Sequence, residues 1–191
     1  MKNLFLSFVP LLAAVLVFAG CESENLTDNP VANQKQINDG SNSNEAVALN
    51  KFGGELEGEL ALARSGTAKY HDISRAIQDG YVDINVVIQG MGYHYLNSNL
   101  VDSIFDPEKP EILVYTKNPV NGKMRLVAVE YAVPNTEPMP EGFTGSEDVW
   151  VNNTDFNLWL VHAWVWYNNP HGMFNGMNPR VHVEEGEITY P

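Results

Sequence analysis

Cysteine is nearly missing from this chain: its 191 residues contain one, Cys21. A single thiol cannot close an intramolecular disulfide, and it excludes Cys-x-x-Cys redox and metal motifs. The folded part must therefore be held together by packing alone, which is unusual for an exported domain. Phosphate-binding glycine loops, nucleophile elbows and the spacing of EF-hand calcium loops are also absent. No motif identifies a reaction, and whether the chain is an enzyme stays open.

Positive charge is scarce as well. Lys and Arg number 11 against 24 Asp and Glu, which gives a formal net charge of −13. Such a surface repels nucleic acid and anionic lipid headgroups. We therefore expect no nucleic-acid partner, and we expect any association with a membrane to come from covalently attached lipid.

The longest apolar run stands at the start of the chain. It covers residues 4–19, follows Lys2 and is shorter than the ~20 residues that a membrane-spanning helix needs. This arrangement predicts a secretory signal peptide over residues 1–20. Residues 18–21, Phe-Ala-Gly-Cys, resemble the lipobox of bacterial lipoproteins, in which the cysteine is acylated and becomes the mature N-terminus. The resemblance implies lipidation of Cys21 and a place in the bacterial envelope, facing the periplasm or the cell exterior. A cleaved soluble form and a retained anchor are the alternatives.

The composition changes again after the leader. Residues 22–50 are rich in Asn, Ser, Asp and Gln and contain no aromatic residue. Such a segment can bury too little apolar area to offset the entropy of the chain. We predict a flexible tether over residues 21–50 and a single globular domain over residues 51–191.

Apolar residues within this domain first follow a helical period and then alternate. The helical period predicts a main helix over residues 67–80, ended by Gly80, and a weaker helical turn around Leu56, Leu60 and Ala63. Gly90 and Gly92 predict a bulge or a close approach of the backbone. The alternation predicts strands, with an Asn-Gly turn between the third and the fourth, over residues 81–89, 93–95, 111–116, 124–133 and 157–167.

A helix followed by strands with hairpin-like turns predicts an α+β fold. We expect a curved antiparallel β-sheet with one main N-terminal helix packed on one face. A small β-barrel with the helix as a lid is the alternative. Residues 134–148 form a long loop of the kind that often borders a site.

Three polar side chains fall inside the predicted strands. His94 lies between Tyr93 and Tyr95, Glu130 shares its face with alanines, and His162 lies in the most apolar strand. A buried carboxylate needs a hydrogen-bonded or charged partner. Two imidazoles and a carboxylate are also a donor set for a divalent metal such as zinc, iron, copper or nickel. Three interpretations of His94, Glu130 and His162 stay open: a polar network in the core, a ligand or metal site, and a catalytic group.

Aromatic residues suggest a second site. Trp164, Trp166, Tyr93 and Tyr95 could line a pocket for a sugar or an apolar ligand, because flat rings stack on such groups. The alternative is that these four side chains belong to an ordinary hydrophobic core.

Several sequence blocks, taken together, resemble a family of uncharacterised bacterial exported proteins. They cover most of residues 66–179 and include GMGYHY at 90–95, PEILVY at 110–115, VEYAVP at 129–134 and HAWVWYNNPHGMF at 162–174. The resemblance implies export and a single small domain, and it brings no activity or catalytic residue set.

These observations predict a lipid-anchored envelope protein whose domain is a small-ligand-binding or interaction module. Two alternatives belong to other classes. One is a metal-dependent enzyme that uses His94, Glu130 and His162, and the other is a structural envelope component that assembles through sheet edges or the 134–148 loop.

Overall fold

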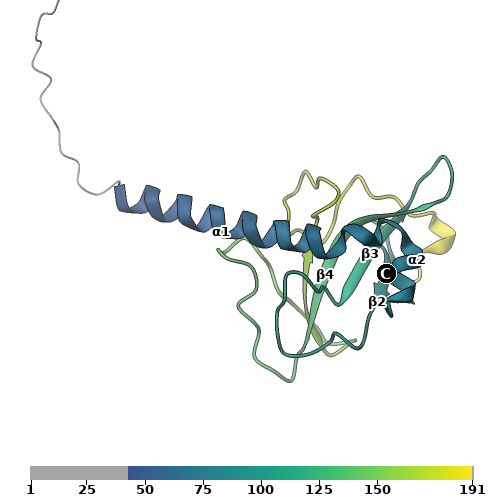
Figure 1. Cartoon of the computed structure of the whole chain (residues 1–191). Coiled ribbons are helices and arrows are strands. Elements are labelled where there is room, and N and C mark those ends of the chain that lie inside the picture. Colours follow the sequence, from purple (N-terminus) through teal and green to yellow (C-terminus); the bar gives the residue numbers. More distant parts are fainter. Residues whose placement is uncertain (1–42, 191) are drawn as a thin grey trace, which may run out of the picture. The chain divides into compact units, whose positions relative to one another are not determined.

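The computed structural model describes the backbone of residues 43–190 and the side chains of residues 53–190. The predicted signal peptide, Cys21 and the tether up to residue 42 lie outside the described residues. The helical elements come first: α1 (Ser43–Thr67), the 3₁₀ turn η1 (Ala68–His71) and α2 (Ile73–Gln78). The strands follow (Figure 1): β1 (Val82–Ile88), β2 (Gly92–Leu96), β3 (Ile112–Lys117), β4 (Met124–Pro134), β5 (Val151–Asn153) and β6 (Leu158–Ala163). A second 3₁₀ turn, η2 (Glu185–Glu187), comes near the end of the chain.

The strands form one antiparallel sheet in the order β1-β2-β3-β4-β6-β5. This sheet curls into a half-barrel, and the main helix precedes it in the chain, so the predicted α+β fold is confirmed. The strand predicted over 157–167 is too long, because β6 ends at Ala163. There the chain turns away: the Trp164 N–H donates to the carbonyl of Met173, which belongs to a loop.

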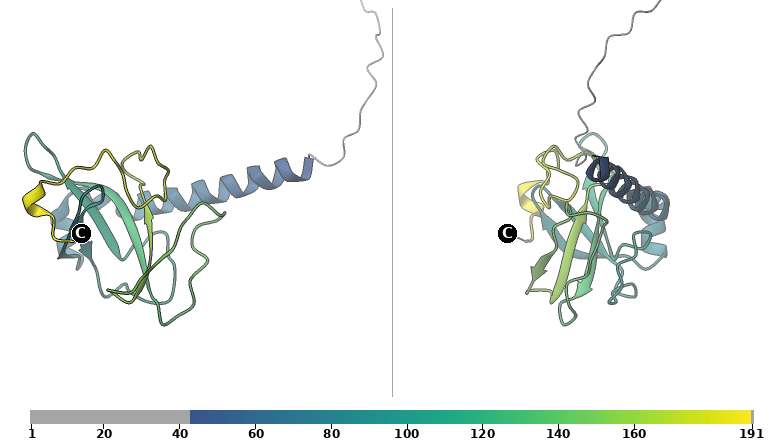
Figure 2. Two further views of the ribbon diagram at one scale, coloured as in Figure 1. Left: turned by 180° about the vertical axis from the view of Figure 1, so that it is seen from behind. Right: turned by 90° about the vertical axis from the view of Figure 1, so that its left-hand side faces the viewer.

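Two hydrophobic cores lie on opposite faces of the sheet. Leu113, Val129 and Tyr131 belong to one core, with residues of α1, η1 and α2. Residues next to them in the same strands, among them Val114 and Ala132, belong to the other core. Because successive side chains of a strand point to opposite faces, the helices cover one face only. Figure 2 shows the helices on one side of the sheet. The C-terminal segment contributes to both cores, with Phe174 and Val183 in the first and Val181 in the second.

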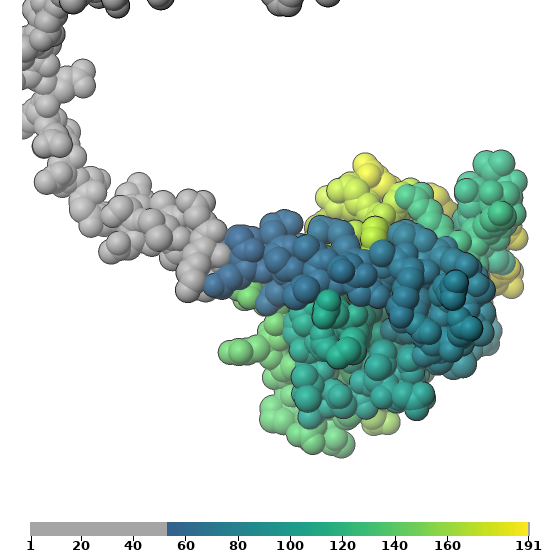
Figure 3. Space-filling model, viewed as in Figure 1, coloured from purple at the N-terminus to yellow at the C-terminus, as the bar shows by residue number. Residues whose placement is uncertain are grey.

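The main helix is α1, not the predicted helix over 67–80. Its side chains Leu56, Leu60, Ala63 and Thr67, spaced four or three residues apart, form one stripe that packs towards the sheet. Gly66 lies so close to the backbone of Glu108 that a Cβ there would be 2.1 Å from its carbonyl oxygen. This close approach sets the end of α1 against the loop between β2 and β3 (Figure 3).

Two sequence predictions are corrected in this part of the chain. The helix predicted over 67–80 is interrupted at Asp72, whose backbone is extended and whose carboxylate accepts a hydrogen bond from the Ser74 N–H at 3.1 Å. Aspartate is a better N-cap than a helix-interior residue, so α2 starts anew after it. The tether predicted up to residue 50 is already helical from Ser43, where the run Glu-Ala-Val-Ala-Leu at 45–49 favours a helix.

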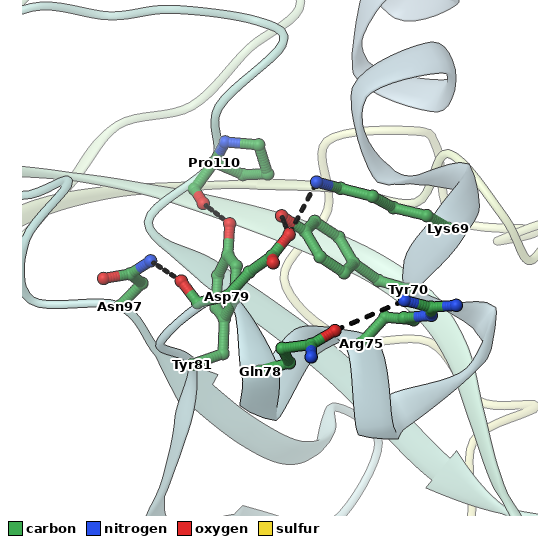
Figure 4. A network of polar contacts seen from close by, with 8 residues as sticks. All are labelled: Lys69, Tyr70, Arg75, Gln78, Asp79, Tyr81, Asn97 and Pro110. Atoms are coloured by element: carbon green, nitrogen blue, oxygen red, sulfur yellow. Dashed lines mark hydrogen bonds and ion pairs between the residues drawn. The ribbon is translucent and has the colours of Figure 1, made fainter.

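Polar contacts tie α2 to the sheet (Figure 4). The Asp79 carboxylate accepts a hydrogen bond from the Tyr70 hydroxyl at 3.1 Å, and the Asp79 carbonyl accepts one from the Asn97 amide at 3.0 Å. The Tyr81 hydroxyl donates to the carbonyl of Pro110 at 2.6 Å. The helix-covered face is therefore fixed by packing and by hydrogen bonds. Across the described residues, no helix has the length and apolar character needed to cross a membrane.

The close backbone approach predicted around Gly90 and Gly92 is present. Gly92 has φ +118°, and a Cβ there would lie 2.1 Å from the carbonyl oxygen of Tyr115. Only glycine fits this position without strain, so β2 can lie against β3 at the point where the turn from β1 ends.

Candidate functional site

A cavity of about 320 Å³ lies on the face of the sheet that the helices leave uncovered. Strand β1 contributes Ile84, Val86 and Ile88 to its lining, and β5 contributes Val151 and Asn153. These two strands are the opposite edges of the sheet. Because one cavity is lined by both edges, it lies on the concave side of the half-barrel.

The C-terminal segment spans the gap between the two edges. The backbone N–H groups of Thr189 and Tyr190 donate to the carbonyl of Val87 in β1, at 3.1 and 3.3 Å. The Tyr190 hydroxyl donates to the carboxylate of Asp155 in the turn between β5 and β6, and the Tyr190 ring lies 5.8 Å from that of Phe156. The segment therefore closes part of the barrel wall that the strands leave open.

The cavity opens to solvent through an apolar mouth. Val151, Phe156 and Met177 line the cavity and yet remain 57%, 42% and 50% exposed. Large apolar side chains gathered at the rim of a cavity are typical of a site that receives an apolar molecule.

Two polar side chains on the sheet, His94 of β2 and Glu130 of β4, face this cavity. They are only 3% and 5% exposed. The Nδ1 atom of His94 lies 2.9 Å from the carbonyl oxygen of Val86. Because a carbonyl oxygen only accepts, Nδ1 carries the ring proton, and Nε2 is left as a hydrogen-bond acceptor. Nε2 lies 3.9 Å from Oε2 of Glu130, which is too long for a hydrogen bond.

Both groups are neutral near pH 7. Burial raises the pKa of Glu130 to about 8, so the carboxyl group keeps its proton. Burial also lowers the pKa of His94, so the imidazole is uncharged. The contact between His94 and Glu130 is therefore not an ion pair. It is a carboxylic acid, which can donate one hydrogen bond, beside an imidazole nitrogen that can accept one.

His162 lies directly across from Glu130 in the β4–β6 register, but it is not among the cavity-lining residues. Its ring stacks on Trp164, with ring centres 4.6 Å apart and an interplanar angle of 11°. Both ring nitrogens are buried without a hydrogen-bond partner. Burial lowers the pKa of His162 to about 3, so this imidazole is neutral as well.

The metal site predicted from His94, Glu130 and His162 is not formed. Within the part of the chain that the structure describes, no three His, Cys, Asp or Glu side chains are placed to hold a metal ion. The reason lies in the orientation of His162, whose ring is stacked against Trp164 instead of sharing a centre with the other two. The structure therefore brings together His94 and Glu130 and leaves out His162.

None of the four aromatic residues predicted to bind a ligand lines this cavity, and Tyr93 instead lines a separate hollow with Lys117 and His182. Tyr93 and Tyr95 pack in the core on the helix-covered face. They flank His94 in β2, so the alternation that turns His94 into the cavity turns both tyrosines away from it.

Trp164 and Trp166 follow the end of β6, where the strand alternation no longer applies. The Trp164 indole N–H donates to the carbonyl of Asn175 at 2.5 Å. The Trp166 indole N–H donates to the Thr67 hydroxyl at the end of α1, at 3.0 Å. Trp164 and Trp166 therefore pack against the two hydrophobic cores, and a ligand-binding role for these rings stays a prediction.

Sequence reasoning missed the aliphatic lining. The alternation over residues 81–89 predicts a half-buried strand with Ile84, Val86 and Ile88 on one face, and such a pattern does not distinguish core residues from the lining of a cavity. Met177 and Tyr190 come from segments outside the strands, and no pattern pointed to them.

Comparison with known proteins gives no family for this chain. The chain matches no protein-family model, no curated protein and no solved structure. Its function is therefore argued from the cavity.

Proposed function

We propose that this domain binds a small apolar molecule in the cavity of the half-barrel. The observation that carries the proposal is the lining, in which most side chains are apolar and two of the few polar ones, His94 and Glu130, are buried. Known small-molecule sites have volumes of roughly 300–1,000 Å³ and the same mixture of many apolar groups and few polar ones. An apolar cavity of roughly 150 Å³ can bind benzene, so about 320 Å³ leaves room for roughly ten to twelve non-hydrogen atoms.

Substitution of a lining residue tests the proposal. We expect Ile84→Trp to weaken binding of n-butylbenzene, measured by calorimetry, by at least about tenfold, because the indole ring occupies the space of the ligand. Ile77→Trp is the matched control, since Ile77 lies on α2 and is 57% exposed. This control should bind like the wild type. Equal affinities of all three proteins would contradict the proposal, provided that their circular dichroism spectra agree.

We also propose that the domain is exported and anchored to the bacterial envelope by lipid on Cys21. The apolar leader and the Phe-Ala-Gly-Cys tetrad support this placement. Mass spectrometry of the protein from its native membrane should find acyl chains on an N-terminal Cys21. Cys21→Ser should lack them, because serine has no sulfur atom to acylate. An unprocessed, unmodified native chain would contradict the placement.

A further inference from the structure

We infer that the ligand of this cavity carries a hydroxyl group, which is bound between Glu130 and His94. The inference rests on the proposed function and names the chemical class of the ligand: an uncharged, mostly apolar alcohol.

Only some of the polar side chains that line the cavity are free to form a hydrogen bond with a ligand. Among the described lining residues, the polar side chains belong to His94, Glu130, Asn153 and Tyr190. The Asn153 side-chain oxygen already accepts hydrogen bonds from two backbone N–H groups of the β5–β6 turn, both at 3.1 Å. The Tyr190 hydroxyl is bonded to Asp155. His94 and Glu130, which are 3% and 5% exposed, are the buried polar pair of the lining, whereas the Asn153 amide group belongs to the edge strand β5.

The distance between these two groups suits one shared ligand atom. Nε2 of His94 and Oε2 of Glu130 are 3.9 Å apart. They are too far apart to bond each other, but a single oxygen atom can lie about 2.8 Å from both of them. One ligand atom can therefore contact both groups at once, and the two groups come from β2 and β4, on either side of β3.

The two groups differ in hydrogen-bonding character. Because the Nδ1 proton of His94 is directed to the Val86 carbonyl, Nε2 requires a donor from the ligand. The neutral Glu130 carboxyl offers a donor and requires an acceptor.

A hydroxyl group supplies both a donor and an acceptor from one atom. An ether oxygen can only accept. A carboxylate can also only accept, and it would bring a charge into an apolar cavity whose described lining includes no Lys or Arg. An alcohol therefore matches the pair better than either group.

Calorimetry with ligands of one size tests the inference. Octan-1-ol and methyl heptyl ether are isomers, but only the alcohol has an O–H group that can donate a hydrogen bond. We expect the alcohol to bind about three- to tenfold more tightly than the ether, the usual effect of one hydrogen bond. Octanoate at pH 7 should bind at least about tenfold more weakly than the alcohol.

Substitutions at His94 and Glu130 test what each side chain contributes to the binding of the alcohol. His94→Phe should abolish the preference for the alcohol over the ether. Glu130→Leu should weaken both oxygen-containing ligands relative to n-butylbenzene, whereas Glu130→Gln, which keeps an N–H donor, should retain the wild-type order. If His94→Phe does not fold, the preference of the wild type for the alcohol over the ether decides the matter together with the two Glu130 variants.

The outcomes separate the two claims. If n-butylbenzene binds but the alcohol and the ether bind equally, or if octanoate binds most tightly, the hydroxyl inference is overturned and the proposed function stands. If none of these ligands binds, the proposed function fails, and the inference fails with it.

Discussion

Between about pH 5 and pH 8, the wild-type protein should lose several kcal/mol of unfolding free energy that the Glu130→Gln variant keeps. Burial raises the pKa of Glu130 from its ordinary value of 4.5 to about 8. Within this window the folded protein retains a proton that the unfolded chain has released. Unfolding therefore releases a proton and becomes more favourable as the pH rises.

The size of the effect follows from the pKa difference. Each pKa unit corresponds to about 1.4 kcal/mol, which gives an upper bound of about 5 kcal/mol for Glu130. Local relaxation around a charged Glu130 reduces this figure, so we expect a difference of about 2–5 kcal/mol. Glutamine at this position does not titrate, and the stability of the variant should follow only the remaining groups.

Glu111 provides a matched comparison. Burial also raises its pKa to about 8, but its carboxyl group accepts a hydrogen bond from the Ala132 N–H at 2.9 Å and does not line the cavity. Glu111→Gln should remove a separate share of the same pH dependence, and the double variant should remove both. Urea unfolding, monitored by tryptophan fluorescence at several pH values, measures each share. Parallel curves for the wild type and Glu130→Gln would show that Glu130 is solvated.

His162→Phe is expected to raise the unfolding free energy by about 2–4 kcal/mol at pH 7. Both ring nitrogens of His162 are buried without a partner, and each such group costs about 1–3 kcal/mol. Phenylalanine has nearly the same shape and can keep the stacked contact with Trp164, at 4.6 Å. The substitution therefore removes the unsatisfied nitrogens and keeps the packing.

The same variant should resist acid. Burial lowers the pKa of His162 from its ordinary value of 6.5 to about 3. Titration of His162 therefore leaves the unfolding free energy unaffected above about pH 6.5 and lowers it as the pH falls towards 3. In this range the unfolded chain binds a proton at His162 that the folded chain does not bind. Acid unfolding of His162→Phe should therefore occur at lower pH. His182→Phe, at an exposed position, is the control and should leave the midpoint unchanged. A loss of stability at pH 7 in His162→Phe would show that this imidazole has a bonding partner.

The elements with strong local signals were predictable from the sequence. Alternation and an Asn-Gly turn located β3 and β4, and Gly80 has the positive φ expected after a helix. The errors occurred where a distant contact overrides the local pattern. The apolar run continues past Ala163, but the Trp164 N–H donates to the carbonyl of Met173. The backbone bonds to β4 again only at Trp166, whose N–H donates to the carbonyl of Val127 at 3.2 Å.

The candidate site was only half predictable. The polar residues His94 and Glu130 stood out in apolar strands. Which face of the sheet is concave depends on its curl, and the curl is a property of all the strands together. For this reason the alternation puts His94 and the tyrosines on opposite faces of β2, but it could not predict which of the two faces lines the cavity.

Methyl-resolved NMR of the protein titrated with octan-1-ol tests the central claim most directly. The methyl signals of Ile84, Ile88, Ile112 and Leu160, which line the cavity, should shift in a saturable way. Those of Leu60, Leu113 and Leu126, in the core under the helices, should stay in place. Saturable shifts confined to the second set, or no shifts in either set up to the solubility limit of the alcohol, would contradict a ligand cavity inside the half-barrel.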